Sequence, residues 1–224
     1  MSRVVMLSLG CVAFFCAGAT PGAAQAVLDF DALTLANYAA LPASYGDGFD
    51  ANIPDVQYRT FTVGTDATLN NFVEFWNADY GDLSKVVYPE ENGYAAEIAF
   101  VPAAGCGVRL ISFDMAGYSH VDRTNSTLRI LDAAGNVVLD YVATQGGGVE
   151  GDGNGPQHSS FTPNLFVPGT LRIQWGNDWD IGMDNIVFES APLTVPEPTT
   201  TALLGLGGAL AAAGALMRRR AARD

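Results

Sequence analysis

Hydrophobic and polar residues alternate over short stretches of the chain, the pattern of β-strands that bury one face. The clearest stretches are 96–100 (Ala-Glu-Ile-Ala-Phe) and 171–175 (Leu-Arg-Ile-Gln-Trp), in which every second residue is apolar. In 171–175 the alternation places Trp175 in the core. Further strands are expected at 27–33, 57–63, 69–77, 108–115, 126–131, 136–144, 160–167 and 182–189.

Turn residues separate these stretches. Asp132-Ala133-Ala134-Gly135 has hairpin chemistry and lies between two of the expected strands. The one helix-like piece is 33–41, expected to form a turn or two. About ten strands without alternating helices predict an all-β fold, an antiparallel two-sheet sandwich of the jelly-roll type.

The first 26 residues have the features of a signal peptide. Arg3 precedes an apolar stretch at 4–17, and Ala24-Gln25-Ala26 forms a cleavage site, so the mature chain is expected to start at Val27. Cys11 and Cys16 raise the alternative of a lipoprotein signal. Neither has the usual Leu three residues before it, which favours the ordinary secretory signal.

The C-terminal residues predict a membrane span followed by a basic tail. Residues 199–217 carry no charge and no proline. As a helix they would extend roughly 28 Å, close to the ~30 Å hydrocarbon core of a bilayer. Pro196 and Pro198 set the start of this helix, and the arginines at 218–220 and 223 would stay in the cytoplasm. An ordinary C-terminal anchor is the alternative.

Pro196, Glu197 and Pro198, the apolar span and then Arg218, Arg219 and Arg220 resemble, in this order, the PEP-CTERM sorting signal of Gram-negative bacteria. The resemblance implies recognition by a membrane protease of the exosortase type and cleavage near Glu197. The protein would pass through the inner membrane, held there by its C-terminal helix, before reaching the cell surface or extracellular matrix. The three motif residues would then be substrate residues.

These features divide the chain into a signal peptide (1–26), a β-sandwich domain (27–191), a linker with the Pro-Glu-Pro motif (192–198), a transmembrane helix (199–217) and a basic tail (218–224). The net charge is −13, and five of the 11 basic residues lie in the two ends, so the domain is strongly acidic. Nucleic acid is therefore excluded as a partner. Cys106 is the only cysteine left after processing, so no intrachain disulfide is expected, and we expect a buried apolar side chain.

The ends of the domain, Leu28-Asp29-Phe30-Asp31 and 182–188 with Asp184 and Asn185, resemble those of galactose-binding-like and carbohydrate-binding-module sandwiches. The resemblance implies a structural calcium held by carboxylates of the first and last strands. Asp29, Asp31 and Asp184 are the candidate ligands, because calcium takes six to eight oxygens. A second candidate, 150–155 (Glu-Gly-Asp-Gly-Asn-Gly), is more typical of a surface loop. The alternative for all these acids is simple solvation.

Aromatic residues near turns are the candidate sugar-binding residues. Trp179 lies between two aspartates, and Trp76 and Tyr80 flank Asn77-Ala78-Asp79. An indole beside carboxylates offers a sugar an apolar face and hydrogen-bond acceptors. The alternative is that these rings are packing residues.

Evidence for catalysis is sparse. His120 and His158 lie in separate loops without metal-ligand spacing, and no G-x-S-x-G motif is present. We therefore expect a non-enzymatic surface or matrix protein that binds exopolysaccharide. The alternatives are an extracellular glycan-active enzyme on the same sandwich, since two carboxylates suffice for a glycosidase, and a permanently membrane-anchored structural domain.

Overall fold

The computed structural model describes residues 25–124, 126–141, 148–151, 154–176 and 179–193. The predicted signal peptide up to residue 24, the Pro-Glu-Pro motif, the predicted membrane span and the arginines at 218–220 lie outside these ranges. Within the described ranges, no helix is long and apolar enough to cross a membrane.

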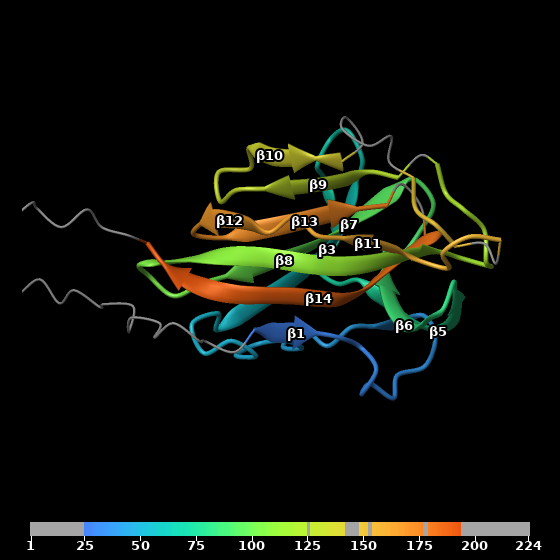
Figure 1. Ribbon diagram of the computed structural model, residues 1–224, viewed down its shortest axis with the longest axis horizontal. Coiled ribbons are helices and arrows are strands. Elements are labelled where there is room, and N and C mark those ends of the chain that lie inside the picture. The colour runs from blue at the N-terminus through green and yellow to red at the C-terminus, as the bar shows by residue number, and fades with distance from the viewer. Residues whose placement is uncertain (1–24, 125, 142–147, 152–153, 177–178, 194–224) are drawn as a thin grey trace, which may run out of the picture. The chain divides into compact units, whose positions relative to one another are not determined.

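The described chain is an all-β sandwich of two antiparallel sheets (Figure 1). One sheet has eight strands: β1 (Ala26–Leu28), β2 (Ala39–Ala40), β5 (Glu74–Tyr80), β6 (Leu83–Tyr88), β8 (Cys106–Gly117), β11 (Ser159–Phe161), β12 (Leu165–Pro168) and β14 (Ile181–Pro192). The other has six: β3 (Asp55–Thr62), β4 (Thr68–Asn70), β7 (Tyr94–Val101), β9 (Leu128–Leu131), β10 (Val137–Asp140) and β13 (Leu171–Trp175).

The predicted all-β two-sheet sandwich is confirmed, and its finer assignment to the jelly-roll type stays a prediction. Residues 33–41 contain turns and β2 and no helix, which corrects that expectation. The hairpin at 132–135 forms as predicted: Asp132 N–H donates to Asn136 O (2.9 Å), and Gly135 adopts a φ of 83°.

The first and last strands are neighbours. β1 pairs antiparallel with β14, so that Ala26 lies opposite Phe188 and Leu28 opposite Ile186. β8 runs along the other edge of β14 (Figure 1). β1 starts at Ala26, one residue before the expected mature N-terminus, and the cleavage site itself stays a prediction.

The core lies between the sheets and is filled by alternate residues of their strands. Phe100 of β7 and Phe188 of β14 are fully buried with ring centroids 4.5 Å apart, and Trp175 of β13 is buried as predicted. Burial of each such side chain stabilises the fold by about 1.5–3 kcal/mol. Cys106 is buried as expected. The absence of an intrachain disulfide after processing stays a prediction.

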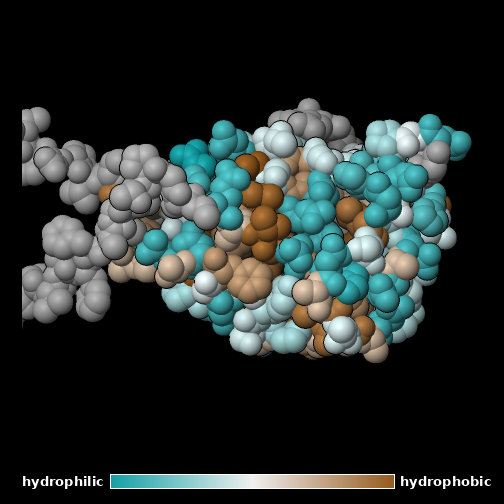
Figure 2. Space-filling view, turned by 60° about the horizontal axis from the view of Figure 1, so that its bottom comes forward, coloured by the Kyte–Doolittle hydropathy of each residue, from teal (hydrophilic) through white to brown (hydrophobic). Residues whose placement is uncertain are grey.

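The face of the sandwich drawn in Figure 2 is mainly hydrophilic and carries separate hydrophobic patches. Large apolar side chains exposed among the described residues include Tyr38 (68%) and Phe49 (48%). Single exposed apolar residues are normal, so a ring becomes informative where it joins others around a hollow.

Candidate ligand-binding site

Two of the predicted sugar-binding residues, Trp76 and Trp179, line one pocket of about 400 Å³. Trp76 comes from β5, and Trp179 lies two residues before the start of β14. The full lining is Tyr38, Trp76, Tyr88, Glu90, Glu91, Asn92, Tyr118 and Trp179. Residues that are far apart in the sequence thus converge at strand ends and loops, the usual location of a binding site.

The five rings of the pocket stand at steep angles to one another. Trp76 contacts Tyr38 at a centroid distance of 4.7 Å and an interplanar angle of 86°. It contacts Tyr118 at 5.7 Å and 89°, and Tyr88 at 6.3 Å and 80°. Tyr118 in turn contacts Trp179 at 4.8 Å and 66°. Edge-to-face contacts of this kind stabilise aromatic clusters and hold the side chains in fixed positions.

A β-bulge in β5 lies next to the pocket residue Trp76. The pairing of β5 with β6 shifts between Asn77 and Tyr80, and the two residues between them, Ala78 (φ 92°) and Asp79 (φ 66°), adopt left-handed backbone conformations. Asp79 O accepts a hydrogen bond from Ser119 N–H (2.7 Å). Left-handed backbone in non-glycine residues costs free energy and is concentrated at functional sites.

Tyr80 lies beneath the pocket and does not line it. It is 1% exposed, packs against Tyr118 at 5.1 Å, and donates its hydroxyl hydrogen bond to Trp179 O (2.5 Å). Tyr80 therefore holds Trp179 in place. Tyr80 belongs to the buried cluster against which Trp76 packs, and the bulge at Ala78 and Asp79 between them was not revealed by the sequence pattern.

The polar side chains of the pocket include two glutamates and Asn92. Glu90 and Glu91 line it, and Glu90 also accepts a hydrogen bond from Asn70. The hydroxyl of Tyr88, another lining residue, donates a hydrogen bond to Glu74 (2.7 Å). Burial raises the pKa of Glu74, the hydrogen bond from Tyr88 lowers it, and the charges of Glu90 and Glu91 raise it further. Among the described residues, Trp76 Nε1–H is one of four buried side-chain atoms without a hydrogen-bond partner.

The predicted calcium ligands lie near one another because β1 pairs with β14. Asp184 is 2% exposed, and its Oδ1 accepts the backbone N–H of Phe30 (3.3 Å), between Asp29 and Asp31. Burial, opposed by backbone hydrogen bonds and assisted by Asp31 and Asp29, raises the pKa of Asp184 to about 7. Within the described ranges, no three His, Cys, Asp or Glu side chains are grouped as a metal site. Calcium binding stays a prediction.

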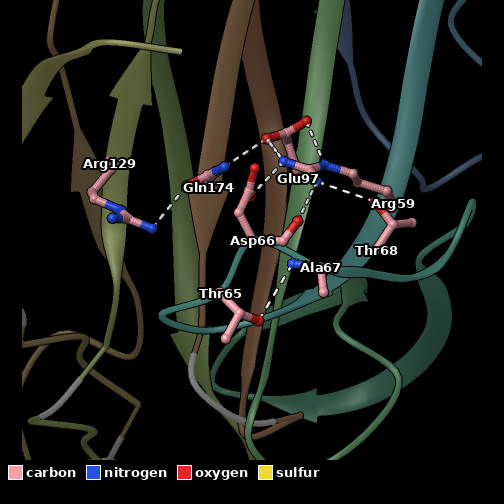
Figure 3. A network of polar contacts seen from close by, with 8 residues as sticks. All are labelled: Arg59, Thr65, Asp66, Ala67, Thr68, Glu97, Arg129 and Gln174. Atoms are coloured by element: carbon pink, nitrogen blue, oxygen red, sulfur yellow. Dashed lines mark hydrogen bonds and ion pairs between the residues drawn. The ribbon is translucent and has the colours of Figure 1, made fainter.

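A polar network crosses the outer face of the six-stranded sheet (Figure 3). Arg59 of β3 donates to both carboxylate oxygens of Glu97 on β7 (2.8 and 2.7 Å), and Gln174 of β13 donates to the same carboxylate (2.6 Å). Arg129 of β9 donates to Gln174 (2.9 Å). This row follows the strand register, and the Glu97 carboxylate accepts a donor on each oxygen.

Both histidines lie in loops, as predicted. His158 Nδ1 is 2.7 Å from Asp82 Oδ1, and Ser160 Oγ donates to Asp114 Oδ1 (2.6 Å). His158, Asp82 and Glu150 help to line a more open hollow of about 570 Å³. Because the Ser160 hydroxyl bonds a carboxylate and not the imidazole, the cluster lacks the nucleophile–base contact of a Ser–His pair.

Comparison with known proteins identifies the C-terminal segment. Residues 194–220 match the family model described as the PEP-CTERM protein-sorting motif, a range that includes Pro196–Pro198 and Arg218–Arg220. The motif implies export, processing by an exosortase and sorting to the cell surface. The match covers the tail and leaves the sandwich unassigned. No curated protein matches the chain.

Solved structures resemble the sandwich distantly. A family 35 carbohydrate binding module from Clostridium thermocellum is 17% identical over 68% of this chain and 98% of its own, with a TM-score of 0.33. The module TmCBM61, in complex with β-1,4-galactotriose, is 15% identical over 71% and 100%, also with a TM-score of 0.33.

An exo-β-1,3-galactanase from Phanerochaete chrysosporium is 15% identical over 68% of this chain, with a TM-score of 0.34. The chain spans 29% of the length of that enzyme. Similarity at this level says nothing about the activity of the present protein.

Proposed function

We propose that this chain, which carries a PEP-CTERM sorting motif, is a non-enzymatic surface or matrix protein whose sandwich binds a glycan in the aromatic pocket. The observation that carries the proposal is the convergence of Trp76 and Trp179 with three tyrosines around one hollow. Two glutamates at the same hollow supply acceptors for hydroxyl groups, and the Asn92 side-chain amide adds a donor and an acceptor. Apolar walls with a few convergent polar groups are the usual composition of a small-molecule site.

The exposure of the pocket indoles supports binding over simple packing. A core aromatic residue such as Trp175 is fully buried and its Nε1–H donates to Ile181 O (3.3 Å). Trp76 and Trp179 are partly exposed and line the hollow, which leaves part of each indole accessible to a ligand. An exposed ring surface at a hollow is what stacking on a sugar requires.

The first test is sugar-dependent retention of the processed protein. Wild type and the Trp76→Ala/Trp179→Ala variant would be applied to immobilised exopolysaccharide and to a glycan array. Binding predicts retention that the double variant loses, with the polysaccharide recovered at unchanged length. Shortened products that persist in this variant would favour the alternative of a glycan-active enzyme.

The second test concerns the tail. Intact-mass analysis of protein from the envelope and from the medium is expected to show a species that starts at Val27 and ends near Glu197. The Pro196→Ala/Glu197→Ala variant is expected to stay in the inner membrane, unprocessed. If wild type and variant both retain residues 218–224, the protein is an anchored structural domain and the release step of the proposal fails.

A structural calcium is a separate part of the proposal. The pairing of β1 with β14 supports it, because it brings the backbone of Asp29, Phe30 and Asp31 to the buried Asp184. Ligation would require the side chains of Asp29 and Asp31 to turn toward Asp184. Calcium is expected to raise the melting temperature of wild type at neutral pH and to leave that of Asp184→Asn unchanged. An equal response of both proteins would exclude this site.

A further inference from the structure

The arrangement of the rings in the aromatic pocket differs from a flat platform for a sugar ring. Tyr38, Tyr88 and Tyr118 each meet Trp76 at interplanar angles of 80–89°, so none of them extends the Trp76 face into a flat platform. Together with Trp179 these four rings line one hollow of about 400 Å³. A hollow lined by rings of different orientation fits a compact group, and ring faces attract a cation that lies within about 6 Å of their centroids.

The charge at the pocket has one sign. Among its lining residues Glu90 and Glu91 are acidic and none is basic. Arg123 lies beside Tyr118, whose backbone O accepts from it (3.1 Å), but its guanidinium is paired with Asp180 at 2.8 Å. Glu74 adds a third acid behind Tyr88. The whole chain carries −13, so no long-range positive charge offsets these groups.

We propose that the pocket takes the ammonium group of an amino sugar, so that the preferred ligand is a glycan with free amines and not a neutral one. The inference rests on the proposed function and specifies its ligand class. The faces of the aromatic rings contact the ammonium group and the carbon that bears it. The carboxylates of Glu90 and Glu91 offset the positive charge of the ammonium group.

The test compares two ligands that differ only in this group. Calorimetry would be carried out on the processed protein with the tetramer of β-1,4-linked glucosamine and with its N-acetylated counterpart, below the pKa of the amine. We expect the free amine to bind about tenfold more tightly, the ratio expected for one cation in a partly desolvated aromatic site.

Charge-removing variants separate the pocket from the general acidity of the protein. Glu90→Gln/Glu91→Gln keeps hydrogen-bonding atoms and is expected to remove most of the preference for the amine. The matched control, Asp55→Asn/Glu189→Gln, removes two charges outside the pocket and is expected to keep it. Thermal unfolding checks that both variants fold, and the salt dependence of wild-type binding gives a second measure that needs no variant.

The outcomes distinguish the two proposals. Equal binding of both tetramers to the wild-type pocket, abolished by Trp76→Ala, would overturn the amine preference and leave glycan binding intact. An equal loss in the control variant would overturn it too, because general acidity would then explain the preference. Failure of both tetramers, and of every other glycan on an array, would refute the proposed function itself. n-Butylammonium mimics a lysine side chain. If it bound more tightly than the glucosamine tetramer, the pocket would prefer a peptide amine, which also overturns the inference.

Discussion

Glu97 and Asp184 are both buried carboxylates, 4% and 2% exposed, and their surroundings are opposite. Glu97 accepts two hydrogen bonds from Arg59 and one from Gln174 (Figure 3). Asp184 accepts a backbone N–H from Phe30 and has the acids Asp29 and Asp31 as its charged neighbours. A buried carboxylate that is paired with a cation has its charge neutralised. A buried carboxylate whose charged neighbours are acids favours its protonated form or the binding of a cation. The difference separates a carboxylate satisfied by its hydrogen bonds from one whose protonation is coupled to folding.

The largest effect expected from this comparison is the pH dependence of stability caused by Asp184. Its pKa is about 7 in the folded protein against 3.8 ordinarily. Between these values the folded state keeps a proton that the unfolded state releases, so the free energy of unfolding falls as the pH rises from about 4 to about 7. The limit of this loss is about 4 kcal/mol. Chemical denaturation in EDTA at several pH values measures it.

Asp184→Asn provides the control for that pH dependence. The amide keeps an acceptor oxygen for Phe30 N–H and cannot ionise, so the slope between pH 4 and pH 7 is expected to flatten. An identical slope in wild type and variant would show that other groups cause it.

Removal of Glu97 is expected to cost about 3 kcal/mol of unfolding free energy, because Arg59 is left partly buried without its main partner. Denaturation of Glu97→Ala measures this loss. Replacement of both partners, Arg59→Met/Glu97→Leu, is expected to recover most of it, and glycan binding should be unchanged in both variants. Loss of binding would mean that the network belongs to a ligand site.

In the aromatic pocket, in contrast, a substitution is expected to change glycan binding. Trp76→Ala is expected to weaken glycan binding about 30-fold, equivalent to about 2 kcal/mol, as for a central aromatic contact. Phe49→Ala is the matched control, an exposed aromatic residue that does not line the pocket. Calorimetry measures the affinities, and equal affinities of the two variants would identify Trp76 as a packing residue.

The smallest effect concerns the β-bulge at Ala78 and Asp79. Ala78→Gly is expected to stabilise the fold by about 1 kcal/mol, because glycine adopts the φ of 92° without a steric cost. Gly64→Ala tests the same cost in the other direction, since a Cβ at this φ of 89° meets no neighbour within 4 Å. A melting temperature that does not rise in Ala78→Gly would show that the turn carries no strain.

The sequence predicted the strands with clear alternation and missed β6. Residues 171–175 and 96–100 alternate and lie within β13 and β7. β6 reads Leu-Ser-Lys-Val-Val-Tyr, and Val86, Val87 and Tyr88 are all buried, because the two valines pack on opposite sides of the sheet. A strand covered on both faces loses the period-two signal that identifies half-buried strands.

The sequence identified part of the aromatic pocket. Trp76 and Trp179 stood out because of their polar, turn-like surroundings, and the structure places both in the wall. Tyr38 and Tyr118 carried no such signal. Tyr118 reaches the pocket through a bridge to Tyr80, and that pairing depends on contacts between distant parts of the chain. Local patterns can nominate a ring, but they cannot show which rings meet.

The length of β14 sets where a captured glycan would lie with respect to the rest of the chain. Trp179 of the pocket comes shortly before this strand, and Leu193 comes directly after it. Twelve residues of extended strand span roughly 40 Å. Leu193, where the described chain ends, therefore lies at the opposite end of this strand from Trp179. A polymer that entered the proposed site would be held at the end of β14 that is remote from Leu193.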